Sequence, residues 1–186
     1  MRLFLAGVVP EPVRESLAQQ LEPVRAATPQ ARWLPPDSLH LTLVFLGSVP
    51  DVSVPALRLA FAGVCGRHHA MSLTLAGVET FGPPRSPRVL ATSLCGEVEP
   101  LRALVVDARA AAAPVVQLEP ERPFRPHLTV ARARSPRGDV LLGRCRAALG
   151  QALHGGFVLR DVALVRSETL SSGAVHTELE RWTLAG

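Results

Sequence analysis

The sequence predicts a mixed helix-and-strand fold that is built twice and forms two similar lobes around a central cleft. One observation is a repeated tripeptide pattern, His-x-Thr, which occurs as His40-Leu-Thr42 and as His127-Leu-Thr129. Another is the order of the segments, since strand, helix, His-x-Thr strand, helix and strand follow one another in both halves. A third is a common spacing between equivalent positions. We therefore infer an internal duplication.

The common spacing is 86 or 87 residues at three separate places. Arg2 and Arg88 lie 86 residues apart, the two motif histidines lie 87 apart, and Met71 and Phe157 lie 86 apart. A chain of 186 residues suits one domain, so we treat residues 1–186 as a single duplicated domain. The simplest arrangement is pseudo-twofold, with the helices outside and with His opposite His and Thr opposite Thr across the cleft.

The first pseudo-repeat, about residues 1–80, begins with a strand at Arg2–Val9. Apolar residues at helical spacing predict a helix after Pro10, because proline suits the first turn. A proline-rich loop leads from this helix to the first His-x-Thr strand, which ends at Gly47. A second helix and a strand at Met71–Glu79 complete the repeat.

The second pseudo-repeat, about residues 87–186, follows the same order. A strand at Arg88–Leu94 precedes a third helix and a long loop, which leads to the second His-x-Thr strand. The remaining segments are a fourth helix at 139–153, strands near 156–166 and 174–184, and a turn at Ser171-Ser172-Gly173.

Each His-x-Thr motif places two polar side chains on one face of an otherwise apolar strand. Side chains alternate between the faces of a strand, so His40 shares a face with Thr42, and His127 shares one with Thr129. A buried polar pair costs free energy unless it forms hydrogen bonds or binds a ligand. A lone strand histidine is usually structural, but two copies of the pattern on equivalent strands favour a shared site.

The composition indicates a large core and says little about a partner. The chain is 47% hydrophobic, has a formal charge of +4, and contains arginine but no lysine. Because Asn, Ile and Tyr are absent as well, a GC-rich coding sequence explains the arginine excess better than nucleic-acid binding does. More informative is the local arginine density around the second motif: Arg122, Arg125, Arg132, Arg134 and Arg137.

The cysteines and the N-terminal segment bear on the compartment. Cys65, Cys95 and Cys145 are odd in number and far apart, which argues against a disulfide framework or a metal knuckle. The apolar segment 1–9 runs into Pro-Glu-Pro without a small-residue cleavage site, so we interpret it as a strand rather than a signal peptide. No apolar run approaches the roughly 20 residues of a membrane span. We expect a cytoplasmic protein with no membrane partner.

Two histidines that face one cleft suit acid–base catalysis. An imidazole has an ordinary pKa of about 6.5, so near neutral pH one ring can act as a base while the other acts as an acid. Phosphodiester hydrolysis needs both, and a threonine hydroxyl or an arginine can bind the phosphate. A metal site is the main competing interpretation. Because no carboxylate or thiolate lies at ligand spacing from His40 or His127, we expect neither a metal nor another cofactor.

The other histidines lie outside any repeat-related pair. We interpret the adjacent His68 and His69 as a solvated helix cap, and His154 and His176 as structural or surface residues. The sequence contains no glycine-rich phosphate loop of the nucleotide-binding kinds, and no serine or cysteine nucleophile with an acid–base partner is recognisable.

The two motifs and their flanks resemble those of the two-histidine phosphoesterases. Within that group they are similar to the bacterial and archaeal RNA 2′,3′-cyclic phosphodiesterases, also called 2′-5′ RNA ligases. The resemblance covers nearly the whole chain and rests on Arg2–Ala6, Leu39–Gly47, Arg122–Arg132 and Leu179–Trp182. One departure is His176, at a position where relatives often carry tyrosine.

The resemblance implies a bilobal α+β fold with antiparallel sheets lining a central cleft. It implies metal-independent hydrolysis of a 2′,3′-cyclic phosphate at an RNA 3′ end to a 2′-phosphate, and a reversible 2′-5′ joining activity. It suggests His40 as the acid on O3′ and His127 as the base on water. The expected partners are such RNA ends, tRNA fragments and cyclic nucleotides among them, bound by a monomer. The alternative is an RNA-end binding module of the same fold without turnover, which would be favoured by the loss of a motif residue.

Two further expectations concern substrate binding. Thr42, Thr129 and Arg132 are expected to bind the substrate phosphate. Phe45 and Arg132 each follow their motif histidine by five residues, so a nucleobase can stack between the ring and the guanidinium. Strict alternation puts both on the face opposite the histidines, so this clamp needs a bulge or twist at the strand end. The competing interpretation places Phe45 in the core.

Overall fold

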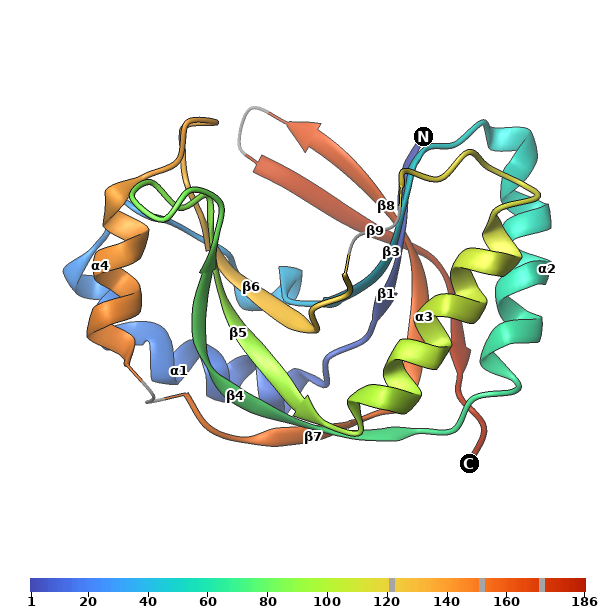
Figure 1. The fold of residues 1–186 in the computed structure, drawn as a ribbon, viewed down its shortest axis with the longest axis horizontal. Coiled ribbons are helices and arrows are strands. Elements are labelled where there is room, and N and C mark those ends of the chain that lie inside the picture. Colours follow the sequence, from blue (N-terminus) through green and yellow to red (C-terminus); the bar gives the residue numbers. More distant parts are fainter. Residues whose placement is uncertain (121–122, 151–152, 171–172) are drawn as a thin grey trace.

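The computed structural model describes residues 1–120, 123–150, 153–170 and 173–186, in which nine strands form a single curled sheet (Figure 1). All pairings between these strands are antiparallel. The order across the sheet is β7-β4-β5-β6-β3-β1-β8-β9, and the short strand β2 pairs with β6. The strands are β1 (Arg2–Gly7), β2 (Arg32–Trp33), β3 (Leu41–Ser48), β4 (Met71–Phe81), β5 (Val89–Gly96), β6 (His127–Arg132), β7 (Gly156–Leu159), β8 (Asp161–Leu170) and β9 (Gly173–Thr183).

The helices lie outside the sheet in two pairs, α1 with α4 and α2 with α3, on opposite sides of the molecule (Figure 1). This confirms the predicted α+β class and the outer position of the helices. The helical segments are α1 (Glu11–Ala27), α2 (Val54–Cys65), α3 (Val98–Ala112) and α4 (Val140–Leu149), with short 3-10 turns η1 (Pro36–Ser38) and η2 (Asp51–Ser53).

The two lobes are not the two halves of the sequence. One lobe contains β4, β5, β6 and β7 with α1 and α4, and the other contains β1, β3, β8 and β9 with α2 and α3 (Figure 1). Each pseudo-repeat therefore contributes strands and helices to both lobes. The exchange is visible at Arg160, where the chain leaves β7, which pairs with β4, and enters β8, which pairs with β1. The single strand predicted near 156–166 is thus two strands, because its parts belong to different lobes.

The pseudo-twofold relation can be followed in the strand register. Thr42 of β3 pairs with Ala6 of β1, and Thr129 of β6 pairs with Ala91 of β5. The structure therefore aligns Ala6 with Ala91, a spacing of 85 residues, one fewer than Arg2 and Arg88 indicate. The structural equivalence of β1 and β5 therefore differs by one residue from the equivalence that the sequence pattern indicates.

Helix α4 is shorter than predicted. Asp139 caps its first turn by accepting a hydrogen bond from the backbone N–H of Leu141 at 2.9 Å. The helix ends at Leu149, because Gly150 has a φ of 54°, in the left-handed region that glycine tolerates best. The rest of the predicted segment includes residues 151–152, and the predicted turn includes 171–172; these residues lie outside the described part of the chain.

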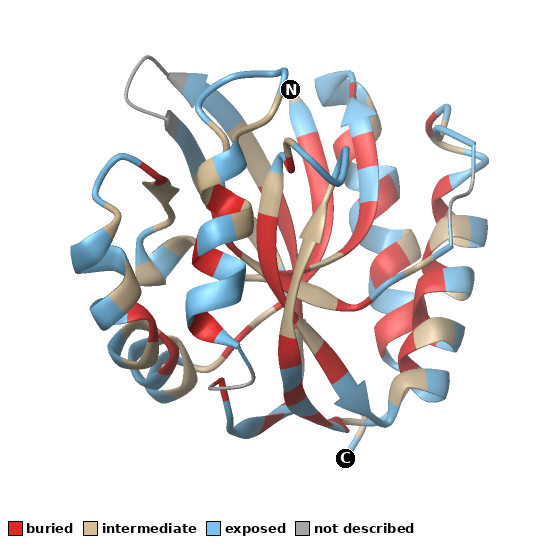
Figure 2. Ribbon diagram, turned by 60° about the vertical axis from the view of Figure 1, so that its left-hand side comes forward, coloured by how far each residue is buried: buried red, intermediate tan, exposed pale blue. Residues whose placement is uncertain are grey.

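The buried residues concentrate between the helices and the sheet (Figure 2). In α1 the inward stripe contains Leu17 and Leu21, as its helical spacing predicts. A small separate cluster on the other face of the sheet joins Phe4 and Ala6 of β1 to Ala163 and Val165 of β8. Among the described residues no helix is both long and apolar enough to span a membrane.

Candidate active site

The two His-x-Thr motifs meet where β3 and β6 pair. Leu41 of β3 is the cross-strand partner of Leu128 of β6. Because the strands are antiparallel, this register puts Thr129 across from His40 and His127 across from Thr42. The predicted arrangement of His opposite His and Thr opposite Thr is therefore wrong in detail. The four side chains alternate around one point of the sheet, with the two histidines on a diagonal.

The two histidine rings are oriented by the same backbone hydrogen bond. Nδ1 of His40 lies 2.7 Å from the carbonyl oxygen of Ser38, and Nδ1 of His127 lies 2.7 Å from that of Arg125. A carbonyl oxygen only accepts, so Nδ1 carries the proton and donates it in both rings. Each Nε2 then has a lone pair in the neutral ring, and neither has a hydrogen-bond partner among the described residues. Both rings thus offer Nε2 to a ligand.

A phenylalanine packs against each histidine. The Phe4 ring lies 4.8 Å from the His40 ring, and the Phe81 ring lies 4.6 Å from the His127 ring, measured between centroids. These contacts limit rotation of the imidazoles and exclude water from one side. They come from β1 and from the end of β4, which are not equivalent strands, so the pseudo-symmetry of the motifs does not relate these two phenylalanines to each other.

The threonine hydroxyls are available to a ligand. Thr42 and Thr129 are both half-buried, and neither hydroxyl makes a hydrogen bond within the described residues. Each can donate its proton to an oxygen placed between the strands.

Burial lowers the pKa of His40 from 6.5 to about 4. The hydrogen bond to Ser38 opposes this shift, whereas the positive charges of His176, Arg132 and His127 add to it. The unliganded His40 is therefore neutral at pH 7. These contributions place His176, Arg132 and His127 within electrostatic reach of His40.

Equivalent β-bulges turn Phe45 and Arg132 toward the histidine face. In β3 the register shifts between Thr42 and Val44, which leaves Leu43 as the extra residue. In β6 it shifts between Thr129 and Ala131, which leaves Val130 as the extra residue. Two consecutive buried residues follow each threonine, Leu43 and Val44 in β3 and Val130 and Ala131 in β6. The next residue in each strand therefore lies on the same face as the threonine and not on the opposite face. The bulge that the clamp needs is thus present in both strands.

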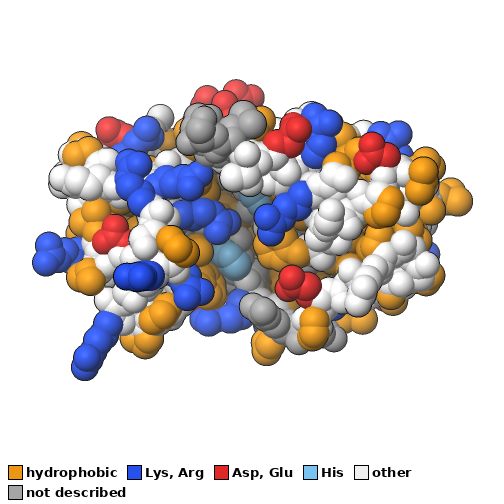
Figure 3. Space-filling model, turned by 90° about the horizontal axis from the view of Figure 1, so that it is seen from above, with side chains coloured by type: hydrophobic (Ala, Val, Ile, Leu, Met, Phe, Trp, Pro, Cys, Tyr) orange, Lys and Arg blue, Asp and Glu red, His pale blue; other side chains and the backbone are white. Residues whose placement is uncertain are grey.

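A cavity of about 750 Å³ lies beside the motifs and is lined by His40, Thr42, Phe45 and Arg132. Phe45 is 66% exposed, so its assignment to the core is wrong. His127 and Thr129 do not line this cavity; their proximity to His40 and Thr42 follows from the strand register. Seen from above, histidine side chains lie in the floor of a groove, and arginine side chains gather along one of its walls (Figure 3).

His176 belongs to the site, so its interpretation as a structural or surface residue is wrong. Its ring lies edge-on to His40 at 5.0 Å and to Phe4 at 5.2 Å, between centroids. Burial, followed by the charge of Arg132, lowers the pKa of His176. It lies on β9, which has no counterpart in the sequence repeat, so a search for paired residues misses it. The departure from tyrosine at this position was the one signal that pointed to it.

The other predicted residues have different surroundings. Arg125 pairs with Glu79 and lies over the Phe81 ring at 4.9 Å, so it supports the wall beside His127. His68 is not a solvated cap: its side chain is 12% exposed, and Nε2 lies 2.9 Å from a carboxylate oxygen of Asp107. Arg122 lies outside the described residues. Within the described part of the chain, no three His, Cys, Asp or Glu side chains cluster as metal ligands would.

A family model and several known proteins match this chain, and they point to the same family. The family model of the 2′-5′ RNA ligase superfamily matches residues 9–169. The chain is 34% identical to an RNA 2′,3′-cyclic phosphodiesterase of Thermus thermophilus, over 100% of this chain and 91% of that protein. It is 26% identical to one of Methanothermobacter thermautotrophicus, over 99% of each chain.

A solved structure gives the same relation. The crystal structure of Escherichia coli LigT complexed with 3′-AMP superposes with a TM-score of 0.76 at 27% identity, covering 100% of this chain and 98% of that one. The duplicated motifs, the curled antiparallel sheet and these matches agree. The chain belongs to the 2′-5′ RNA ligase superfamily.

Proposed function

We propose that the protein hydrolyses 2′,3′-cyclic phosphates at RNA 3′ ends to 2′-phosphates, by acid–base catalysis with His40 and His127. The observation that carries this proposal is the matched pair of imidazoles, each oriented by a carbonyl at 2.7 Å so that Nε2 is available. The relatives named RNA 2′,3′-cyclic phosphodiesterase support the substrate.

The cyclic phosphate would lie above the Leu41–Leu128 pair, between the diagonal histidines. One imidazole takes a proton from water as its oxygen attacks phosphorus. The bond from phosphorus to O3′ breaks, and the other imidazole gives its proton to O3′. Thr42 and Thr129 donate hydrogen bonds to the non-bridging oxygens, and Arg132 offsets their charge. The reaction needs no group beyond these side chains.

The roles of the histidines depend on the substrate charge. We propose His40 as the acid and His127 as the base, the order that the family resemblance implies. With a pKa of about 4, His40 carries no proton on Nε2 in the free enzyme at neutral pH. An anionic phosphate next to the ring favours its charged form, which raises its pKa, so His40 would take up its proton together with the substrate. The reverse 2′-5′ joining would use the same pair with exchanged roles.

The nucleobase would occupy the cavity beside the motifs, between the Phe45 ring and the Arg132 guanidinium. Both residues line it, and the two bulges orient both side chains toward it. The binding of 3′-AMP by Escherichia coli LigT supports a nucleotide in this fold. We further propose that one chain is sufficient, because a single chain supplies all of these residues, and that the protein works in the cytoplasm.

The test is phosphorus NMR of the product formed from a nucleoside 2′,3′-cyclic phosphate in the presence of EDTA. We expect a 2′-phosphate at the same rate with and without the chelator. A 3′-phosphate would overturn the direction of ring opening. Tight binding of the cyclic nucleotide without turnover would favour the alternative, a non-catalytic RNA-end binding module.

A further inference from the structure

A second cavity, which we name the basic hollow, lies next to the active-site cavity. It has a volume of about 640 Å³, and its wall contains Arg25, Arg32, Trp33 and Arg134, with Glu22 as its acidic residue. Within the described residues none of these three arginines forms an ion pair with a carboxylate. The hollow therefore has a concentration of uncompensated positive charge.

The positive charge of the basic hollow extends into the active site through a pair of neighbouring arginines. Arg32 of β2 is the direct cross-strand partner of Arg132 of β6. Burial, followed by the charge of Arg32, lowers the pKa of Arg132. Like charges directly opposite each other destabilise a strand pair. An arrangement of this kind is relieved by an anion between the guanidinium groups, and β2 is where such an anion would lie.

The strand β2 separates the two cavities and borders both. Arg32 and Trp33 line the basic hollow as well as the active-site cavity. The indole Nε1 of Trp33 donates a hydrogen bond to the carbonyl oxygen of Thr28 at 3.2 Å, which holds β2 against the end of α1. A nucleic-acid strand that leaves the active site across β2 would therefore pass directly from the active-site cavity into the basic hollow.

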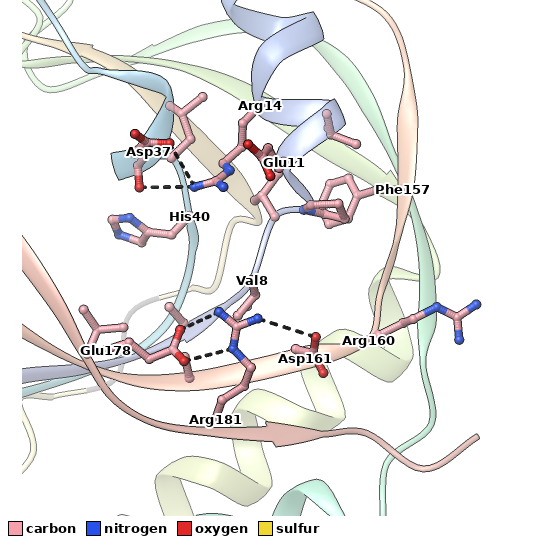
Figure 4. A pocket seen from close by; sticks show the side chains of 18 of the residues that line it. Val8, Glu11, Arg14, Asp37, His40, Phe157, Arg160, Asp161, Glu178 and Arg181 are labelled. Atoms are coloured by element: carbon pink, nitrogen blue, oxygen red, sulfur yellow. Dashed lines mark hydrogen bonds and ion pairs between the residues drawn. The ribbon is translucent and has the colours of Figure 1, made fainter.

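The opposite exit from the active site has a different charge. A cavity of about 680 Å³ on the other side of His40 is lined by three arginines, Arg14, Arg160 and Arg181, and by four carboxylate side chains, Glu11, Asp37, Asp161 and Glu178 (Figure 4). Arg14 pairs with Asp37, and Arg181 pairs with Glu178. A polyanion would therefore meet more carboxylates than arginines in this cavity, and more arginines than carboxylates in the basic hollow.

We propose that the single-stranded RNA upstream of the cyclic-phosphate nucleotide crosses β2 and enters the basic hollow, where Arg25, Arg32 and Arg134 bind its backbone phosphates. This inference rests on the proposed function, because it extends the substrate from the terminal nucleotide to the strand on its 5′ side. It makes RNA oligonucleotides, rather than free cyclic mononucleotides, the preferred substrate class.

The experiment compares two substrates, a cyclic mononucleotide and a tetranucleotide that ends in the same cyclic phosphate. The Arg25 guanidinium forms no hydrogen bond or ion pair within the described residues, so Arg25→Gln removes charge with little structural effect. Arg134 donates from Nε to the carbonyl oxygen of Gln30 at 2.8 Å, so Arg134→Gln is compared with Arg134→Lys, which keeps the charge. The control is Arg67→Gln, after α2 in the other lobe. Thermal unfolding checks that each variant folds.

We expect wild-type kcat/KM to be higher for the tetranucleotide and to fall more steeply with salt. Each glutamine variant should lower tetranucleotide kcat/KM by about fivefold. It should also reduce the slope of the logarithm of kcat/KM against log salt by about 0.7 for each backbone phosphate that the arginine neutralises in the wild-type protein. For the mononucleotide, kcat/KM of the glutamine variants should stay close to the wild-type value. The Arg134→Lys variant and the Arg67→Gln control should retain wild-type kcat/KM for both substrates.

Two outcomes would overturn the inference while leaving the proposed function intact. One is equal kcat/KM and equal salt dependence for both substrates in the wild-type protein. The other is that Arg25→Gln and Arg134→Gln change kcat/KM equally for the two substrates, whether both values fall by the same factor or neither falls. If the wild-type protein hydrolysed neither the mononucleotide nor the tetranucleotide, the proposed function would be overturned, and this inference with it.

Discussion

Leu41 and Leu128, the central residues of the two His-x-Thr motifs, are paired with each other across β3 and β6. Neighbouring strands lie about 4.8 Å apart, so this pair brings both motifs within reach of a single phosphate. The residues on either side of each leucine share one face of the sheet. The site is thus assembled by backbone pairing at the centre of the fold, and its geometry is as rigid as the sheet.

Removal of either histidine should cost most of the activity. We expect His40→Ala and His127→Ala each to lower kcat for a cyclic nucleotide at least about 100-fold, the lower range for losing a general acid or base. His69→Ala, an exposed histidine outside the site, serves as the control and should retain wild-type kcat. Near-full activity of either motif variant would exclude the two-histidine mechanism.

Removal of a threonine hydroxyl should cost less than removal of a histidine. Thr42→Ala and Thr129→Ala should each lower kcat/KM about tenfold, which corresponds to roughly 1.5 kcal/mol for a hydrogen bond to a charged oxygen. Arg132→Ala should impair the enzyme as well, because it loses a charge next to the phosphate. Steady-state kinetics with a cyclic mononucleotide measures all three. Losses as large as those of the histidine variants would mean that a threonine takes part in proton transfer.

Phe45→Ala should weaken nucleotide binding without lowering stability. The ring is 66% exposed, so truncation leaves the core intact, whereas loss of a stacked base raises KM about tenfold. Leu59→Ala, which removes a side chain that is 78% exposed on α2, is the matched control and should change neither quantity. A lowered melting temperature with an unchanged KM would contradict the clamp.

The stability of the free protein should decrease as the pH falls from 6.5 to 4. The pKa of His40 is about 4 in the folded state and 6.5 in the unfolded chain, so the unfolded state binds more protons in this window. Stability is fully present above pH 6.5, and up to about 3 kcal/mol of it is lost on the way to pH 4. The lowered pKa of His176 acts in the same direction.

The measurement is the free energy of unfolding from urea titrations at several pH values. His40→Gln, which cannot titrate, should reduce the slope below pH 6.5. An unchanged slope in this variant would show that His40 is not the group responsible.

The order of the two histidines should follow from leaving-group rescue. A phosphodiester that releases p-nitrophenolate needs no proton on its leaving group, so it should restore turnover to the variant that lacks the acid. We expect rescue of His40→Ala and no rescue of His127→Ala. The opposite pattern would assign the base to His40, in agreement with its neutral state in the free enzyme.

Much of the fold and of the site follows from local patterns in the sequence. The alternation of side chains places His40 with Thr42 and His127 with Thr129, and the repeated motif predicts that the two pairs act together. The offset of five residues identifies Phe45 and Arg132 as equivalent, and alternation itself shows that a bulge is needed to bring them to the site. Such features depend on neighbouring residues in one strand, so the sequence alone contains them.

Only the tertiary structure decided which segments meet. The diagonal arrangement of the histidines depends on the register of Leu41 with Leu128, and the interleaved lobes depend on which strands β7 and β8 choose as partners. His176 enters the site because β9 closes one edge of the sheet beside Phe4 and His40. Register and strand choice are set by packing between residues far apart in the chain, and no pattern within one segment records them.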